Sequence, residues 1–376
     1  MNGFTLPSSR TTAPRMVNNR KANASERNGF QLSIFVFLFM ASPLLSPAAP
    51  SLHYTVSVLN IPGSATSMNS TGTIIGQAYD STGASYGYIY QNGTITKIAD
   101  LPPIPDGFPL TNNFPTAINN AGQVIGFCYD SNYYDIIGYL RNADGTMIDF
   151  YDLTGSINCP PSSINNSGTV VGLAGITQAE GFVFQNGAVT YLGSYQGFPF
   201  DNACFVNDSG QILATYEDEV ILDHGENIRD RGQRAVLITG NEMRSLGIVS
   251  LKYGDDLVIG MNNEAEVIGR TGYPDSYPAF FYFSDHLHVI GEWAPAAINN
   301  AGLIVGQTLE GSPTPSPALI YTGGKLQKLD DLIDPSSGFS IYSPVAINDQ
   351  GQILALCTTQ SAPSTYLNCL LIPSGQ

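Results

Sequence analysis

Positive charge is scarce in this sequence, as are histidine and tryptophan. The 376 residues include 15 Lys and Arg against 31 Asp and Glu, with four His and one Trp. The first 50 positions hold five of the basic residues and one of the acidic ones, so the remainder has ten basic against 30 acidic residues. Because binding to phosphate groups requires clustered Lys and Arg, we expect neither nucleic acid nor an anionic membrane surface as a partner.

Patterns for metal binding and nucleophilic catalysis are missing as well. The chain has no CxxC pair or Cys/His cluster that would indicate zinc, and no G-x-S-x-G motif accompanies its histidines. Asp-containing loops such as Asp80–Gly83 lack the alternating acidic ligands and terminal Glu of a calcium loop. His286 and His288 alternate on one expected strand and share a face, but two histidines do not complete a metal site. We expect no cofactor, no metal and no assigned catalytic residue.

The five cysteines form an odd set, so an exported form would keep at least one free thiol. Cys357 and Cys369 fall on neighbouring strands of one expected hairpin, which makes them the best candidates for a disulfide. Buried free thiols are the alternative, and the sequence leaves both open. The other three are Cys128, Cys159 and Cys204.

The first 50 residues have the features of a secretory signal. A basic lead is followed by the apolar run Leu32–Ala41 and then by small residues, with cleavage expected near Ala48 or Ala49. The lead is long, so Met16 competes with Met1 as the start. An uncleaved anchor is the alternative, although the apolar run is shorter than the roughly 20 residues that span a membrane. We expect a secreted, periplasmic or cell-surface protein without stable membrane insertion after cleavage.

An apolar residue, an Asn and a short turn recur seven times, with 37 to 55 residues between successive Asn positions. A repeat of this length is typical of solenoids and propellers. The seven cores are Met68–Gly72, Ile118–Gly122, Ile164–Gly168, Val206–Gly210, Met261–Ala265, Ile298–Gly302 and Ile347–Gly351.

Each repeat contains four segments with the features of antiparallel strands. Apolar residues alternate with polar ones, β-branched and aromatic residues are frequent, and Asn-Gly or Gly-Gly turns precede segments such as Thr94–Ile98 and Lys325–Leu329. Outside the leader no helical periodicity is evident. The sequence therefore predicts an all-β, seven-bladed β-propeller of four-stranded blades over residues 51–376. The strand at residues 54–59 should complete the last blade and remove its open edge.

The units resemble the HAF-type extracellular repeats of bacteria. The segment Ile118–Gly126, with the sequence INNAGQVIG, matches the core of that repeat most closely, whereas the family's His-Ala-Phe strand has other residues in place of His, such as Tyr86 and Pro278. The resemblance covers roughly residues 54–376. It implies an exported repeat protein, and it carries no catalytic residues over to this chain.

The recurring Asn and Gly are expected to shape turns, since Asn hydrogen-bonds its own turn and Gly accepts a positive φ. Ala265 replaces Gly in the fifth core, so that turn is expected to differ in shape. The connections between second and third strands, and between blades, are longer and should lie on the opposite face. Variable loops on a rigid scaffold are the usual place for binding.

The long loops are rich in aromatic rings and carboxylates, and blade 4 has the largest insertion, from residue 216 to 234. Rings and carboxylates at a propeller mouth suit a sugar or a peptide, although the same rings could simply pack the loops and the seams between blades. The candidate ligand-binding residues are Phe108, Phe114, Phe198, Phe200, Asp201, Tyr253, Asp255, Asp256, Glu292, Trp293, Phe339 and Tyr342.

Two functions are compatible with these features. The first is an exported, monomeric, non-enzymatic scaffold that binds an extracellular glycan or a protein of the cell envelope. The alternative is a carbohydrate-active hydrolase or lyase that uses carboxylates such as Asp201, Asp255, Asp256 and Glu292 at the propeller mouth. Glycoside hydrolysis requires two carboxyl groups roughly 5 to 10 Å apart, one of them with a raised pKa.

Overall fold

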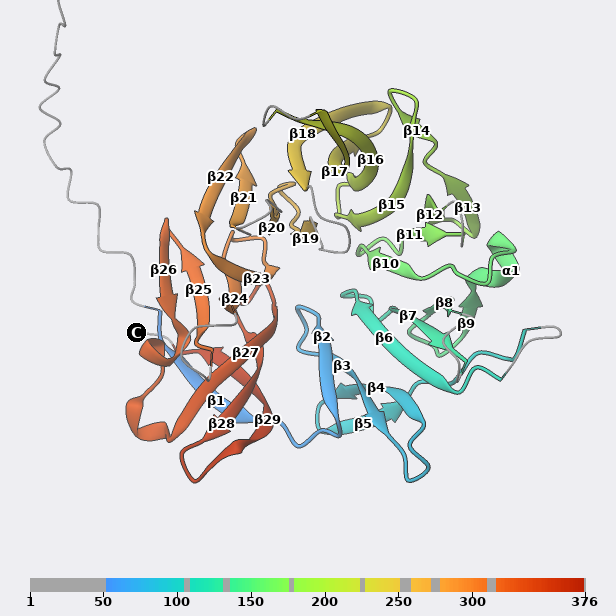
Figure 1. Ribbon diagram of the computed structural model, residues 1–376. Coiled ribbons are helices and arrows are strands. Elements are labelled where there is room, and N and C mark those ends of the chain that lie inside the picture. The colour runs from blue at the N-terminus through green and yellow to red at the C-terminus, as the bar shows by residue number, and fades with distance from the viewer. Residues whose placement is uncertain are drawn as a thin grey trace, which may run out of the picture. The chain divides into compact units, whose positions relative to one another are not determined.

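The computed structural model describes residues 52–104, 109–130, 136–175, 179–223, 227–250, 258–271, 278–309 and 316–374. These residues form seven antiparallel sheets that surround a common centre as the blades of a β-propeller (Figure 1). The predicted fold and number of blades are confirmed.

The strands follow one another in chain order from the centre of the propeller outwards in most blades. Blade 1 contains β2 (Ser64–Met68), β3 (Ile74–Tyr79), β4 (Ser85–Gln91) and β5 (Thr94–Lys97). Blade 2 contains β6 (Asn112–Ile118), β7 (Val124–Tyr129), β8 (Ile136–Arg141) and β9 (Met147–Asp149). Blade 3 contains β10 (Pro161–Ile164), β11 (Val170–Ala174), β12 (Glu180–Gln185) and β13 (Ala188–Tyr191).

Blades 4, 5 and 6 keep this order, blade 4 with a fifth strand, whereas the last strand of blade 7 is β1 from the start of the chain. Blade 4 contains β14 (Ser194–Tyr195), β15 (Phe198–Val206), β16 (Ile212–Asp223), β17 (Asn227–Thr239) and β18 (Glu242–Ser250). Blade 5 contains β19 (Val258–Met261), β20 (Val267–Arg270), β21 (Ala279–Phe283) and β22 (His286–Gly291). Blade 6 contains β23 (Trp293–Ile298), β24 (Ile304–Thr308), β25 (Ala318–Thr322) and β26 (Lys325–Lys328), and blade 7 contains β27 (Phe339–Ile347), β28 (Ile353–Thr359), β29 (Ala362–Pro373) and β1 (Tyr54–Val58).

Blade 7 joins the two ends of the propeller. Strand β1 pairs antiparallel with β29, from Tyr54 opposite Pro373 to Val58 opposite Cys369. The edge that an unclosed ring would expose is therefore paired, which confirms the closure predicted from residues 54–59.

Blade 4 differs from the expected four strands. A two-residue strand, β14, pairs with the start of β15 and makes this a five-stranded sheet. The predicted insertion continues the blade as a long β16–β17 hairpin, whose pairing extends to Asp223 opposite Asn227.

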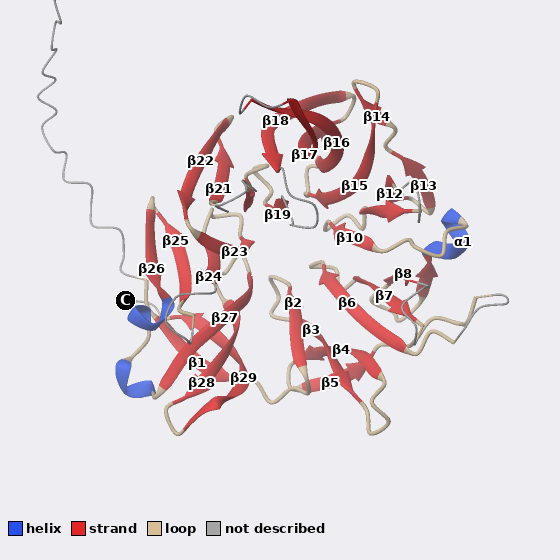
Figure 2. Cartoon of the chain, viewed as in Figure 1, coloured by secondary structure: helices blue, strands red, loops and turns tan. Residues whose placement is uncertain are grey.

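Helical structure in the described residues is limited to three short segments (Figure 2). They are α1 (Phe150–Thr154) and the 3₁₀ turns η1 (Leu329–Leu332) and η2 (Pro335–Ser337). The Asp149 side chain caps α1 by accepting the N–H of Tyr151 at 2.7 Å. No described helix has the length and apolar character to span a membrane.

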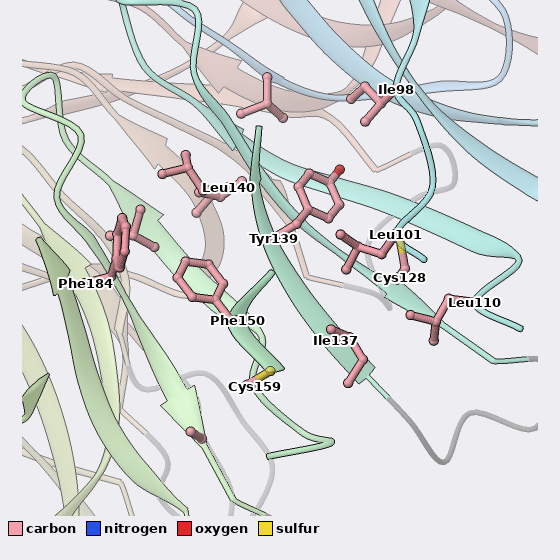
Figure 3. Close-up of a cluster of buried hydrophobic side chains, with 14 of the residues drawn as sticks. Ile98, Leu101, Leu110, Cys128, Ile137, Tyr139, Leu140, Phe150, Cys159 and Phe184 are labelled. Carbon is pink, nitrogen blue, oxygen red and sulfur yellow. The ribbon is translucent and has the colours of Figure 1, made fainter. Parts of the chain in front are cut away.

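Hydrophobic side chains fill the spaces between adjacent blades. The largest cluster joins blades 1, 2 and 3 (Figure 3). There the ring of Phe150 packs 5.4 Å from Phe182 and 5.5 Å from Phe184, so α1 of blade 2 contacts the third strand of blade 3. A fully buried aromatic side chain of this kind contributes about 2–3 kcal/mol of transfer free energy, and this packing holds the blades at fixed positions.

Gly126, which lies in β7 four residues after the turn glycine of blade 2, has a packing function. A Cβ added to Gly126 would lie 2.5 Å from the carbonyl oxygen of Phe114 and 2.6 Å from the hydroxyl of Tyr139. The buried Tyr139 ring therefore crosses the strand at a point where a side chain would clash. The Tyr139 hydroxyl donates to Oδ1 of Asn113 at 2.8 Å.

Antiparallel pairing places two sets of connections on opposite faces of the propeller. The seven Asn turns, between the first and second strands, share one face with the tight turns between third and fourth strands, and we call it the short-turn face. Connections from second to third strands and between blades lie on the other, the long-loop face. This division matches the sequence-based prediction.

Candidate functional site

Seven buried asparagines, one in each blade, link the blades around the centre of the short-turn face. Each donates its Nδ2 amide to the backbone carbonyl oxygen of the corresponding Asn in the next blade, at 2.9 to 3.4 Å. The ring closes because Asn348 of blade 7 donates to the carbonyl oxygen of Asn69 in blade 1 at 3.3 Å. The seven side chains, which are 3–5% exposed, are Asn69, Asn119, Asn165, Asn207, Asn262, Asn299 and Asn348. We call this set the inner Asn ring.

Each side chain of the inner Asn ring also shapes its own turn. Oδ1 of Asn165 accepts the N–H groups of Ser167 at 3.2 Å and of Thr169 at 2.9 Å. The sequence predicted this local function. It did not predict the bond to the next blade, whose acceptor, the carbonyl oxygen of Asn207, lies 42 residues away.

The fifth turn has the same shape as the others, so the expectation of a different turn at Ala265 was wrong. Ala265 has a φ of +56°, close to the +71° of Gly302 in the next turn. Its N–H donates to the carbonyl oxygen of Asn262 at 3.1 Å, as the N–H of Gly302 does to Asn299 at 3.0 Å. Hydrogen bonding within the turn thus holds Ala in the left-handed conformation that usually favours Gly.

The residue after each ring Asn forms a second, exposed ring. Its side-chain oxygen accepts the backbone N–H of the equivalent residue in the preceding blade, at 2.8 to 3.0 Å in six cases. The pattern stops at blade 1, where Ser70 instead donates its hydroxyl to Oδ2 of Asp349 at 3.2 Å. This outer ring consists of Ser70, Asn120, Asn166, Asp208, Asn263, Asn300 and Asp349.

Two cavities open on the short-turn face beside these rings. A central cavity of about 220 Å³ is lined by both rings. A larger cavity of about 620 Å³ lies between blades 1 and 2, and we call it the seam cavity. Both are lined by Asn69, Ile118 and Asn120, so they meet at the blade 2 turn. Sequence reasoning placed binding on the long-loop face and missed both cavities.

The seam cavity is lined mainly by neutral hydrogen-bonding side chains from four strands, β4, β5, β6 and β8, and from the turns beside them. Ile89 and Gln91 of β4 lie opposite Thr96 and Thr94 of β5, which places these four side chains on one face of blade 1. The turns of blades 1 and 2 and the ends of β6 and β8 supply the rest. The complete lining is Asn69, Thr71, Thr73, Ile89, Gln91, Asn92, Thr94, Thr96, Ile118, Asn120, Ala121, Gly122, Arg141 and Ala143.

Two aromatic candidates from the sequence are core residues. Trp293 is 1% exposed and donates its Nε1–H to the carbonyl oxygen of Ile290 at 3.1 Å, while Phe200 is fully buried. Both side chains pack among other buried residues, so their predicted contact with a ligand is corrected. The alternation of residues in the sequence did not show which face of the strand each side chain occupies.

Other aromatic candidates lie at the starts of the innermost strands, on the long-loop face. Phe114 stacks on Phe127 at 5.3 Å in blade 2. In blade 4 the exposed Phe198 lies 5.7 Å from the ring of Tyr216. Phe339 is half-buried in blade 7, as is Tyr342, whose ring lies 4.7 Å from Tyr366. Phe108, Tyr253, Asp255 and Asp256 lie outside the described residues.

Asp201, one of the predicted acids, is half-buried in blade 4. Burial raises the pKa of its carboxyl group, although the hydroxyl of Thr215, which donates to Oδ1 at 2.7 Å, opposes that shift. The charge of Glu217, which the sequence did not single out, raises the pKa further. Glu292 is exposed on the connection between blades 5 and 6.

The structure joins Cys357 of β28 and Cys369 of β29 in a disulfide, with Cα atoms 6.0 Å apart. The other three cysteines are buried and take no part in a disulfide among the described residues. Burial raises the pKa of Cys128 to about 12 and of Cys159 to about 11, which keeps both thiols protonated and unreactive at neutral pH.

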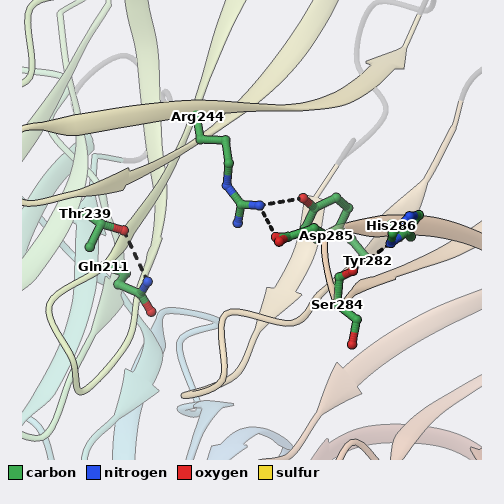
Figure 4. A network of polar contacts seen from close by, with 7 residues as sticks. All are labelled: Gln211, Thr239, Arg244, Tyr282, Ser284, Asp285 and His286. Atoms are coloured by element: carbon green, nitrogen blue, oxygen red, sulfur yellow. Dashed lines mark hydrogen bonds and ion pairs between the residues drawn. The ribbon is translucent and has the colours of Figure 1, made fainter.

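A polar network joins blades 4 and 5 at the outer rim of the short-turn face (Figure 4). Arg244 of β18 donates to the Tyr282 hydroxyl at 3.1 Å and forms an ion pair with Asp285. His286 and His288 alternate on β22 as predicted, with ring centroids 6.4 Å apart. Within the described ranges, no group of three or more His, Cys, Asp or Glu residues is placed to hold a metal ion.

Comparisons with known proteins identify the class of fold and not a family. No family model matches the chain, and no curated protein matches its sequence. The β-propeller domain of the Trilobed protease from Pyrococcus furiosus is similar, with a TM-score of 0.51 and 8% identity over 86% of this chain and 96% of that one. A puromycin-hydrolyzing peptidase of Mycobacterium tuberculosis gives a TM-score of 0.51 and 10% identity, over 85% of this chain and 51% of the peptidase.

This chain therefore spans about half the length of that peptidase. At these identities the likeness shows the β-propeller fold alone. The Pyrococcus domain is described as having an open velcro topology, whereas here β1 pairs with β29 across the closure.

Proposed function

We propose that this chain is an exported, non-catalytic β-propeller that binds an extracellular ligand, a glycan or a partner of the cell envelope, through its short-turn face. The observation that supports this proposal is the seam cavity. Its volume of about 620 Å³ falls within the range of ligand sites, and its lining offers hydroxyl and amide groups and one guanidinium. Such groups recognise a ligand by hydrogen bonds and do not act as acids or bases at neutral pH.

The rings make this face suitable for recognition, because their hydrogen bonds fix the turns that line the cavity. A site held in its binding conformation before the ligand arrives loses less entropy on binding. The signal-like leader and the resemblance to HAF-type repeats support export.

Capture from a cell-envelope extract tests the proposal without assuming a ligand. The immobilised protein should retain a glycan or protein that Thr94→Trp, which fills the seam cavity without adding charge, no longer retains. Thr190→Trp is the matched control, because it places the same side chain on the outer strand of blade 3. Equal capture by both variants, or no capture by the wild type, would refute the assignment to this face.

A second function is favoured by one observation, the raised pKa of Asp201 beside a second acid, Glu217. A carbohydrate-active hydrolase requires two carboxyl groups, one of them with a raised pKa. Release of reducing sugar from envelope polysaccharides, abolished in Asp201→Asn, would establish this alternative. Turnover that persists in Asp201→Asn would exclude Asp201 as its acid.

A further inference from the structure

Arg141 is a half-buried cation in the seam cavity without an ion-pair partner among the described residues. Its Nη1 donates only to the backbone carbonyl oxygen of Asn142, at 3.0 Å. The carboxylate of the neighbouring Asp144 instead accepts the N–H and the hydroxyl of Thr146, at 2.9 and 2.7 Å. A guanidinium offers five donors, so most of its hydrogen-bonding capacity remains for a ligand.

The cavity around Arg141 contains no carboxylate, although acidic residues outnumber basic ones two to one in the chain. A negatively charged ligand would therefore meet attraction from Arg141, while Asp144, whose pKa is lowered by the hydrogen bonds from Thr146 and by the charge of Arg141, lies outside the lining on the exposed turn beside it. Arg binds carboxylates with charge-assisted, often bidentate hydrogen bonds.

Where the seam cavity meets the central cavity, one more donor is available. The Nδ2 amides of Asn166 and Asn263 donate to Oδ2 of Asp208 at 2.7 and 2.8 Å. The equivalent amide of Asn120 has no partner in the part of the chain that the structure describes.

We propose that the seam cavity binds an acidic saccharide, with the carboxylate of a uronate unit on Arg141 and sugar hydroxyls on Asn120 and the threonines. This inference rests on the proposed function and names its ligand class. Thr71, Thr73, Thr94 and Thr96 each donate and accept, as the hydroxyls of a sugar do. The aliphatic side chains of Ile89 and Ile118 suit the C–H face of the ring.

A peptide fits this cavity less well than a saccharide. Peptides that add to a sheet pair with the backbone of an unpaired edge strand. Here Ile89, Gln91, Thr94 and Thr96 present one face of two paired strands. The outer edge of β5 is unpaired in the sheet of blade 1, but these four residues line the cavity with their side chains, which offer hydrogen bonds from the face of the blade.

Isothermal titration calorimetry of the purified chain with trigalacturonate tests the proposal, and maltotriose serves as the neutral probe. We expect trigalacturonate to bind and maltotriose to bind at least about tenfold more weakly, since one charge-assisted contact is worth a factor of that order. Affinity for trigalacturonate should fall as salt is raised from 50 to 500 mM. Equal affinities for both sugars would overturn the carboxylate assignment.

Arg141→Gln should reduce the affinity for trigalacturonate about tenfold or more and leave the affinity for maltotriose unchanged. Arg244→Gln is the matched control, since it removes an arginine from the same face outside the cavity. Both variants should keep the far-UV circular dichroism spectrum of the wild type. Full affinity in Arg141→Gln would overturn the proposal. If neither sugar binds but envelope capture still depends on Thr94, the ligand class is wrong and the proposed function stands; if capture also fails, both are refuted.

Discussion

The inner Asn ring makes a strong prediction about stability, and Asn165 tests it best. Its Nδ2–H donates to the carbonyl oxygen of Asn207 at 2.9 Å, and its Oδ1 accepts the N–H of the buried Thr169 at 2.9 Å. Asn165→Ala removes both bonds and leaves the Thr169 N–H without its partner. A buried donor that loses its partner costs about 1–3 kcal/mol and a typical hydrogen bond about 1 kcal/mol, so unfolding free energy should fall by about 2–4 kcal/mol.

A second substitution separates the ring from the turn. Asn165→Asp keeps an acceptor for the N–H of Thr169, so the stability should remain near that of the wild type if Asn165 only shapes its own turn. If the bond to the next blade also matters, a carboxylate oxygen now faces the carbonyl oxygen of Asn207. We then expect the free energy of unfolding to fall by about 2 kcal/mol or more. Asn166→Ala, at the exposed neighbouring position, should cost less than about 1 kcal/mol.

Equilibrium unfolding in urea measures these differences. Trp293, the only tryptophan, is buried in blade 6 and reports unfolding by fluorescence, while far-UV circular dichroism reports all blades. Coincident transitions from the two probes justify a two-state free energy. If Asn165→Ala and Asn165→Asp both remain within about 0.5 kcal/mol of the wild type, the ring does not stabilise the propeller and the reasoning fails.

Three further predictions concern backbone strain, the disulfide and pH. Ala265→Gly should stabilise the fold by about 0.5–1 kcal/mol in urea unfolding because it relieves the left-handed alanine, whereas Gly72→Ala, with open space around its Cβ, should destabilise it similarly. Reduction of the Cys357–Cys369 disulfide, which links residues 12 positions apart, should lower the free energy of unfolding by about 3 kcal/mol. In the variant with serine at both positions, the reducing agent should have no effect. Burial raises the pKa of Asp201 in the folded state, so the protonated carboxyl group favours folding at a pH below the unfolded-state pKa. This contribution is lost as the pH rises through the folded-state pKa. Asp201→Asn should therefore stabilise the protein relative to the wild type more at pH 7 than at pH 4.

Local patterns in the sequence were sufficient to predict the fold. Period-2 alternation and Asn-Gly turns are short-range features, and their sevenfold recurrence set the number of blades. The closing strand could also be predicted, because the last repeat lacked a fourth strand and Tyr54–Val58 was unassigned. The exceptions are local too: β14 and α1 are too short to produce a periodic signal.

The candidate site was harder to predict because it depends on distances between blades. Nothing near Asn165 indicates that its amide reaches a carbonyl oxygen 42 residues later. Burial of Phe200 and Trp293 depends on which face of an inner strand meets the next blade. The lining of the seam cavity includes Thr73, at the position where the longer Gln123 of blade 2 reaches Asn142 at 2.9 Å, and nothing local in the sequence indicates that a cavity forms there.

The same turn residues can therefore hold the propeller together and contribute to recognition. Asn120 supplies its N–H and Oδ1 to the outer ring, to Asn166 at 2.8 Å and Ser70 at 2.9 Å, and keeps Nδ2 available at the cavity. The hydrogen bond at Oδ1 fixes the side chain, so Nδ2 is held in place without a ligand, which reduces the entropy lost on binding. An Asn120→Asp substitution would preserve the ring acceptor while replacing the available donor with a negative charge. It should weaken trigalacturonate binding more than it lowers the free energy of unfolding, and the reverse order would assign Asn120 to the scaffold alone.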